Sequence, residues 1–126
     1  MSKDPAEWLK QADYDFETAE SLFQSGRYFY AVFMCHLAIE KALKAVYLNR
    51  LQKEPPKTHN LLYLMETNNI QAPENINTII FFLNRVSIPT RYPDDLAKML
   101  REYNKDEIRN LLDQAREVIL WIKEKL

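Results

Sequence analysis

The sequence predicts an all-α protein, an antiparallel, up-and-down bundle of four to five helices. Apolar residues recur at steps of three and four through most of the chain, which is the period of an amphipathic helix. No stretch shows the strict alternation of polar and apolar residues that is typical of a half-buried strand. The 126 residues, 47% of them hydrophobic and 28% charged, suffice for one domain with its own core. We therefore expect residues 1–126 to form a single helical domain.

The stretch Arg27–Leu51 is the expected central helix of this bundle. Every residue from Tyr28 to Cys35 is apolar or aromatic, and no glycine or proline interrupts the stretch. A helix that is apolar all round is buried all round. The rest of the chain should therefore pack around this element.

One narrow polar stripe crosses the central helix. His36, Glu40 and Lys44 are spaced at i, i+4 and i+8, which places them on one face. This stripe is either the solvent edge of the helix, stabilised by a Glu40–Lys44 pair, or a face turned toward a groove or a partner subunit. The periodicity favours neither alternative over the other.

The first and last helices carry clear starting signals. Asp4 is a favourable N-cap and Pro5 suits the first helical position. Asn104, followed three residues later by Glu107, starts the last helix in a similar way. Gly26, the only glycine, follows the first helix and predicts a left-handed C-cap. The first two helices should therefore be antiparallel neighbours.

Prolines divide the middle of the chain. The central helix must end before Pro55-Pro56, because these prolines force an extended segment. Thr58 should then cap a short third helix, with His59 in its first turn. Ala72-Pro73 opens a fourth helix, and Pro89 should close it because the residue before a proline is driven out of the α region.

The segment from Pro89 to Pro93 is the most unusual part of the sequence. Its two prolines stiffen a short connection and hold Arg91 and Tyr92 between them. Arg91 offers a planar fork suited to phosphate, and Tyr92 offers an aromatic face on which a base can stack. The alternative is that Arg91 makes an ion pair and Tyr92 packs as a lid on the bundle. If they bind a ligand, Arg85 should line the same groove, with His36, Glu40 and Lys44 at its border.

Composition and motifs narrow the possible functions. The formal net charge is −1, so any contact with nucleic acid must be local. A single cysteine, Cys35, allows no disulfide within the chain, and the start of the sequence has no signal-peptide pattern, so we expect a cytoplasmic protein. The longest apolar run is far too short to span a membrane. There is no phosphate-binding glycine loop, no Glu-x-x-His pair and no zinc motif, so no metal or cofactor is expected.

Four short motifs follow one another along the chain: Gly26-Arg27-Tyr28, His36 with Glu40-Lys41-Ala42-Leu43-Lys44-Ala45, Pro55-Pro56-Lys57-Thr58-His59-Asn60-Leu61, and Arg91-Tyr92-Pro93-Asp94. In this order they resemble the HEPN domain (higher eukaryotes and prokaryotes nucleotide-binding), in its small stand-alone prokaryotic type. The resemblance covers essentially the whole chain. It implies a helical bundle, commonly a homodimer, often encoded beside a minimal nucleotidyltransferase.

The resemblance also implies two possible activities. Ribonuclease members of the family carry an arginine, then four to six further residues, and then a histidine, and they need no metal. In this sequence Thr90, Arg91 and Tyr92 stand five to seven positions after Arg85, and no histidine follows His59. We therefore expect a non-catalytic module that binds a nucleotide, an RNA or a protein partner, paired with a minimal nucleotidyltransferase in a toxin–antitoxin-like system. The alternative is a ribonuclease that uses an atypical histidine such as His36.

The expected binding residues and structural residues follow from these patterns. The candidate ligand- or partner-binding residues are Arg85, Arg91, Tyr92, His36, Glu40 and Lys44, and the candidate structural residues are Gly26, Thr58 and Pro93. We name no catalytic residue. The chain has more bulky aromatic residues than a small bundle usually buries, which favours a homodimer.

Overall fold

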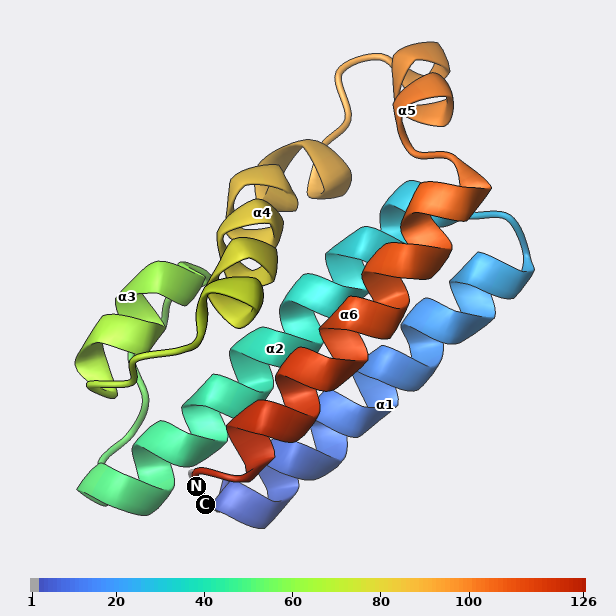
Figure 1. Ribbon diagram of the computed structural model, residues 1–126. Coiled ribbons are helices and arrows are strands. Elements are labelled where there is room, and N and C mark those ends of the chain that lie inside the picture. Colours follow the sequence, from blue (N-terminus) through green and yellow to red (C-terminus); the bar gives the residue numbers. More distant parts are fainter. Residues whose placement is uncertain (1–2) are drawn as a thin grey trace.

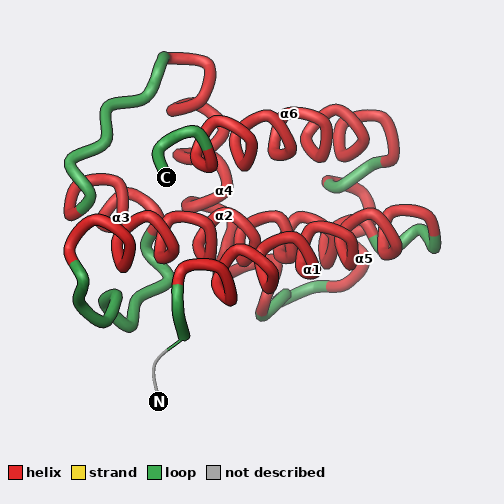
Figure 2. Tube along the Cα trace, turned by 90° about the horizontal axis from the view of Figure 1, so that it is seen from below, coloured by secondary structure: helices red, strands yellow, loops and turns green. Residues whose placement is uncertain are grey.

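The computed structural model describes residues 3–126, and within that range it contains six helices and no strand (Figures 1 and 2). The helices are α1 (Pro5–Gln24), α2 (Tyr28–Leu51), α3 (Leu61–Thr67), α4 (Glu74–Arg91), α5 (Leu96–Glu102) and α6 (Lys105–Lys123). The four long helices α1, α2, α4 and α6 run alternately up and down, the short helix α3 lies beside α4, and the short helix α5 lies at the upper end of the bundle (Figure 1). This arrangement confirms the predicted all-α, up-and-down bundle.

Helix α2 is the centre of the molecule, as its sequence predicts. It packs against all five other helices. Its large aliphatic side chains at Val32, Ile39, Leu43 and Val46 are fully buried, and so are the smaller apolar residues between them. The other helices each bury one apolar face against α2 or against a helix next to it, which explains why only α2 is apolar nearly all round.

The predicted helix ends at Asp4, Gly26 and Asn104 are confirmed. The side chain of Asp4 accepts a hydrogen bond of 2.7 Å from the Glu7 amide, and Asn104 accepts one of 3.0 Å from the Glu107 amide. Gly26 has φ +79°, and the next amide, that of Arg27, donates back to the Leu22 carbonyl at 2.8 Å. This left-handed cap closes α1 and lets α2 start two residues later, antiparallel to α1.

The prediction that Pro89 closes the fourth helix is wrong. Helix α4 continues through Pro89 to Arg91, and its last turn is held by the Tyr92 amide, which donates to the Ile88 carbonyl at 2.8 Å. A proline removes its own amide donor and crowds the carbonyl four residues earlier, but a helix can pass through it near its end where the neighbouring hydrogen bonds hold. Arg91 is therefore the last helical residue, and the stiff segment between Pro89 and Pro93 does not form as predicted.

The prediction that Thr58 caps the third helix is also wrong. The cap of α3 is Asn60, whose side-chain oxygen accepts hydrogen bonds from the amides of Leu62 and Tyr63. The Thr58 hydroxyl instead accepts a hydrogen bond of 3.1 Å from the Asn60 amide and so orders the turn before the cap. His59 consequently lies outside the helix, in the connection between α2 and α3.

Candidate functional site

The polar stripe of α2 is buried, so the interpretation of it as a solvent edge is wrong. His36 is fully inaccessible, Glu40 is 3% exposed and Lys44 is 7% exposed. Residues distant in sequence contact the stripe: His59 bonds to both His36 and Glu40, and the Trp8 ring lies 5.5 Å from the Lys44 ammonium nitrogen. The stripe is therefore part of the protein interior, and residues from other segments cover it.

Glu40 is the centre of this buried charged network. Its Oε2 accepts a hydrogen bond of 2.9 Å from Lys44 Nζ, and its Oε1 accepts one of 2.8 Å from His59 Nδ1. Both carboxylate oxygens are thus hydrogen-bonded. A buried carboxylate is tolerated only when it is paired in this way, so Lys44 and His59 both stabilise the charge of Glu40.

His36 holds the backbone of the same connection. Its Nε2 donates to the carbonyl oxygen of His59 at 2.9 Å, because a carbonyl can only accept. Its Nδ1 has no hydrogen-bond partner and lies 3.9 Å from Glu40 Oε1. Burial lowers the pKa of His36, and the charge of Arg91 lowers it further, while Glu40 opposes both effects. His36 is therefore a neutral structural group that positions His59.

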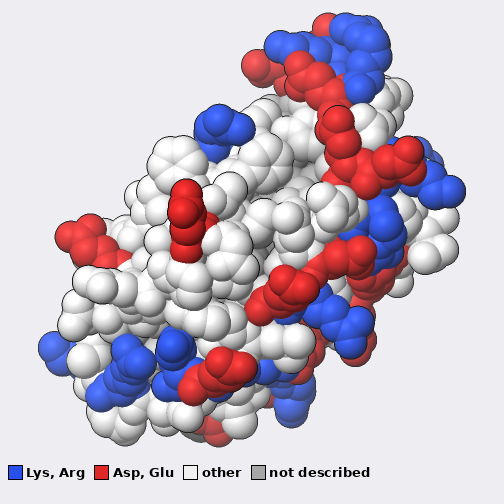
Figure 3. All heavy atoms as spheres, viewed as in Figure 1, with Lys and Arg blue, Asp and Glu red and all other residues white. Residues whose placement is uncertain are grey.

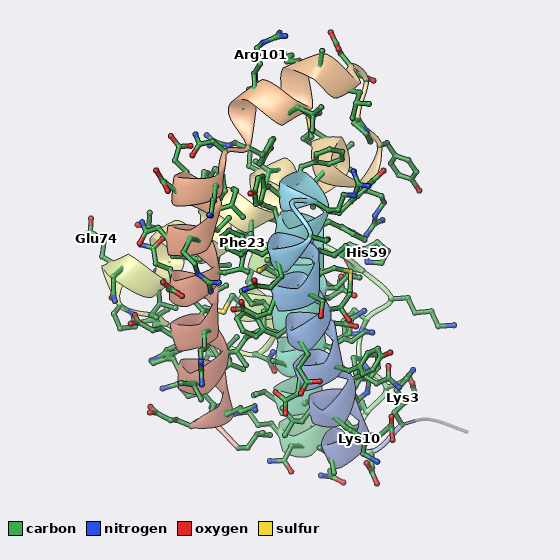
Figure 4. All side chains as sticks on the ribbon, turned by 90° about the vertical axis from the view of Figure 1, so that its right-hand side faces the viewer. Lys3, Lys10, Phe23, His59, Glu74 and Arg101 are labelled. Carbon is green, nitrogen blue, oxygen red and sulfur yellow. The ribbon has the colours of Figure 1, made fainter. Side chains whose placement is uncertain are left out.

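His59 is the exposed end of the network. Its side chain is 59% exposed, whereas that of Glu40, to which it bonds, is 4% exposed. Figure 4 shows His59 at the outer edge of the bundle, on the same side as Lys3. Nδ1 is occupied by Glu40, and within residues 3–126 Nε2 has no hydrogen-bond partner, so a ligand can reach it.

Arg91 lies close to this network from the end of α4. Its guanidinium carbon is 4.8 Å from the ring centroid of Phe33, one turn before His36 on α2. After burial, the positive charge of Arg91 is a smaller cause of the lowered pKa of His36. Within residues 3–126 Arg91 makes no ion pair, so its donors remain free for a ligand. Tyr92, the next residue, is 67% exposed.

Arg85 does not join these residues, contrary to the expectation of one shared groove. Arg85 and Arg91 are six positions apart on one helix, which turns their side chains about 120° away from each other. Arg85 lies over the ring of Phe82, at 5.5 Å, and lines a groove between α4, α5 and α6. The structure therefore places Arg91 beside Phe33 and near His36, and Arg85 on a different face.

Two residues of this site were not among the predicted ones. His59 was interpreted as a helix-start residue, and Phe33 only as part of the apolar run. The motif that begins at Pro55-Pro56 contains His59 and could have marked it as a site residue. The rigid connection brings His59 back over α2, which the sequence does not reveal by itself.

The side chains at this site can bind an anion or stack on a planar ring. Arg91, His59 and Tyr92 offer a guanidinium, an imidazole nitrogen and an exposed aromatic ring. Among residues 3–126, no three His, Cys, Asp or Glu side chains are arranged to hold a metal ion. None of the helices in that range has the length and apolar character needed to cross a membrane.

Comparison with known proteins agrees with this description. The family model of the HEPN domain matches residues 5–126, so the chain belongs to the HEPN domain family. The fold is similar to the crystal structure of TT1696 from Thermus thermophilus, with a TM-score of 0.82, 29% identity, and 97% of this chain and 98% of that chain covered. It is also similar to ST0689, an archaeal HEPN homologue, with a TM-score of 0.77, 26% identity and 98% of both chains covered. No curated protein matches significantly.

Proposed function

We propose that this chain is a non-catalytic HEPN module that binds a nucleotide, or an acidic group of a protein partner, through Arg91, Tyr92 and His59. The observation that carries the proposal is Thr90. Counted from Arg85, it stands at the first of the positions at which the resemblance implies a histidine in ribonuclease members, and it is fully buried. Its hydroxyl donates to the Val86 carbonyl at 2.7 Å. Thr90 therefore has neither the basicity nor the access that proton transfer to a substrate requires.

Binding chemistry supports the same proposal. Stacking on Phe33 fixes the guanidinium of Arg91 and leaves its hydrogen-bond donors free. A guanidinium with free donors matches a phosphate or carboxylate group in two parallel hydrogen bonds. The exposed ring of Tyr92, the next residue in the chain, can stack on a base, and His59 adds one further donor or acceptor.

The partner we propose is a minimal nucleotidyltransferase, encoded with this chain in a toxin–antitoxin-like pair in the cytoplasm. The family resemblance supports this pairing. The only cysteine, Cys35, is fully buried, and burial raises the pKa of its thiol, so it is an unreactive core residue that is compatible with a reducing compartment.

A second candidate function is metal-independent cleavage of RNA, and the Glu40–His59 pair favours it. A buried carboxylate that holds Nδ1 of an exposed imidazole leaves Nε2 free to accept or donate a proton. The candidate histidine is then His59 and not His36, because His36 is buried and its Nε2 is bonded to the His59 carbonyl. This alternative uses the same site but requires turnover.

One experiment separates the two functions. The tagged protein is expressed in its native host, and its bound proteins are identified by mass spectrometry for the wild type, Arg91→Ala and the control Arg116→Ala. Arg116 is exposed and lies on α6. We expect a nucleotidyltransferase with wild type and Arg116→Ala and much less with Arg91→Ala. If the purified protein instead cleaves RNA in the presence of EDTA, and His59→Ala abolishes cleavage, the second function holds and the first fails.

A further inference from the structure

The connection between α2 and α3 is bonded to two different helices at its end. It returns along the bundle from the end of α2, and α3 then begins next to α4 (Figure 1). On one side, His36 and Glu40 of α2 bond the carbonyl and the ring of His59. On the other side, Asn84 of α4 bonds the two residues that follow. We call this stretch the His59 segment; it consists of His59, Asn60 and Leu61.

Asn84 makes two hydrogen bonds to the His59 segment. Its Oδ1 accepts one of 2.7 Å from the amide of Leu61, the first residue of α3, and its Nδ2 donates one of 3.3 Å to the side-chain oxygen of Asn60. That same oxygen caps α3 by accepting from the amides of Leu62 and Tyr63. The first amides of a helix have no partner within the helix. Asn84 therefore completes the cap from another helix and fixes the start of α3 on α4.

Asn84 and Arg91 lie on the same side of α4. They are seven residues apart, which is close to two full turns, so their side chains leave the helix in nearly the same direction. Arg91 lies over Phe33 of α2, one turn before His36, which bonds the His59 carbonyl. One continuous helix thus carries both the guanidinium of the candidate site and the side chain that holds the His59 segment.

The contribution of Asn84 is one of geometry and not of charge. Helix α4 carries only three charged residues, Glu74, Arg85 and Arg91. In the view of Figure 3 the surface over α4 is largely uncharged. Because asparagine is neutral, its replacement by alanine leaves the net charge around the site unchanged. A change in the affinity for an anion then reports a change in the position of other groups.

We propose that Asn84 is a positioning residue for the site formed by Arg91 and His59. The bonds from α2 fix His59 relative to α2, whereas Arg91 belongs to α4. By bonding the two residues after His59, Asn84 sets the position of the imidazole relative to the guanidinium, so that one ligand meets both. The inference rests on the proposed function, because it requires Arg91 and His59 to bind the same ligand. It goes further in assigning their relative position to a residue that does not touch the ligand.

Calorimetric titration of the full chain with ATP tests this role. Asn84→Ala should weaken ATP binding about three- to tenfold, which is the effect of losing one hydrogen bond from His59. The matched control is Asn77→Ala. Asn77 lies seven residues earlier on the same side of α4, and its side chain donates to the Ala72 carbonyl instead of the His59 segment. The control should bind ATP within about twofold of the wild type. Circular dichroism and thermal unfolding establish that the variants are folded at the titration temperature.

A double variant shows whether Asn84 acts through His59. If it does, Asn84→Ala should have no further effect once His59 is absent, so the double variant should bind ATP within about twofold of His59→Ala alone. A general loosening of the fold would instead weaken binding in both backgrounds. NMR gives a second measurement: ATP should shift the imidazole signals of His59 in the wild type and in Asn77→Ala, and much less in Asn84→Ala.

The outcomes separate this inference from the proposed function. If the wild type and His59→Ala differ in ATP affinity but Asn84→Ala equals the wild type, the proposed function stands and the role of Asn84 is overturned. Equal losses from Asn84→Ala with and without His59 also overturn it, because the effect then does not pass through His59. ATP binding that His59→Ala leaves unchanged overturns it too. A wild type that binds no ATP overturns the proposed nucleotide site and this inference together.

Discussion

The Nδ1 atom of His59 lies 2.8 Å from Oε1 of Glu40, although 19 positions separate the two residues and only Glu40 is buried. This hydrogen bond ties an exposed imidazole to the interior of the bundle. It also fixes the connection between α2 and α3 on α2, together with the bond from His36 to the His59 carbonyl. The stability of the domain and the geometry of its candidate site therefore depend on the same carboxylate.

Replacing Glu40 should destabilise the protein strongly. Glu40→Gln leaves the Lys44 ammonium, which is nearly buried, without its charged partner, and removing one member of a buried ion pair typically costs about 3–5 kcal/mol. Urea unfolding measures this change in the free energy of unfolding. The control Glu117→Gln, on the exposed side of α6, should cost less than about 0.5 kcal/mol. Equal free energies of unfolding for the two variants would show that the network around Glu40 does not stabilise the fold.

Stability should fall as the pH is lowered below about 6.5. Burial lowers the pKa of His36 in the folded protein from its ordinary value of 6.5, so the unfolded chain binds a proton at this residue that the folded chain does not. The stabilisation by neutral His36 is fully present above pH 6.5 and is lost as the pH falls below that value. The charged or titratable groups that act on His36 are Glu40 on its own helix, His59 and Arg91.

Unfolding in urea at a series of pH values between about 7.5 and 5 measures this effect. Each pH unit below 6.5 should remove up to about 1.4 kcal/mol. His36→Gln should make the curve flatter, because glutamine keeps a donor for the His59 carbonyl but does not titrate. A curve with the same slope in wild type and His36→Gln would rule out His36 as the group responsible.

Gly26→Ala should destabilise the protein by roughly 1 kcal/mol. Gly26 has φ +79°, and a Cβ there meets no atom within 4 Å, so the cost comes from the backbone conformation alone. Gly26→Asn should cost less, because asparagine tolerates the left-handed region. Differential scanning calorimetry of the two variants tests the ranking. An unchanged melting temperature for Gly26→Ala would contradict the role of this residue as the cap of α1.

The parts of the fold that could be predicted are those that local sequence determines. Asp4, Gly26 and Asn104 act on the amides and carbonyls of their own helices, so their roles follow from neighbouring residues alone. Pro89 was misinterpreted because the remaining hydrogen bonds of α4 tolerate it near the helix end. Such tolerance depends on the packing of the last turn, which local sequence does not encode.

The site was harder to predict because residues distant in sequence build it. The spacing of His36, Glu40 and Lys44 predicted that they share one face of the helix, but their burial depends on Trp8 and His59, which reach that face from other segments. The separation of Arg85 from Arg91 follows from the continuation of α4 through Pro89, since only a continuous helix fixes the angle between them. The wrong prediction that the fourth helix ends at Pro89 therefore led to the wrong prediction that Arg85 and Arg91 share one groove.

The central claim is that Arg91 is the anchor of a binding site, and calorimetric titration with ATP tests it most directly. We predict that the wild type and the control Arg116→Ala bind ATP with the same affinity. Arg91→Ala should weaken binding at least about tenfold, which is the effect of losing a charge-assisted hydrogen bond of about 1.5–3 kcal/mol. Arg91→Lys should not restore it, because an ammonium lacks the fork of a guanidinium. Binding by Arg91→Ala that equals the wild type, or no heat of binding with the wild type, would contradict the account.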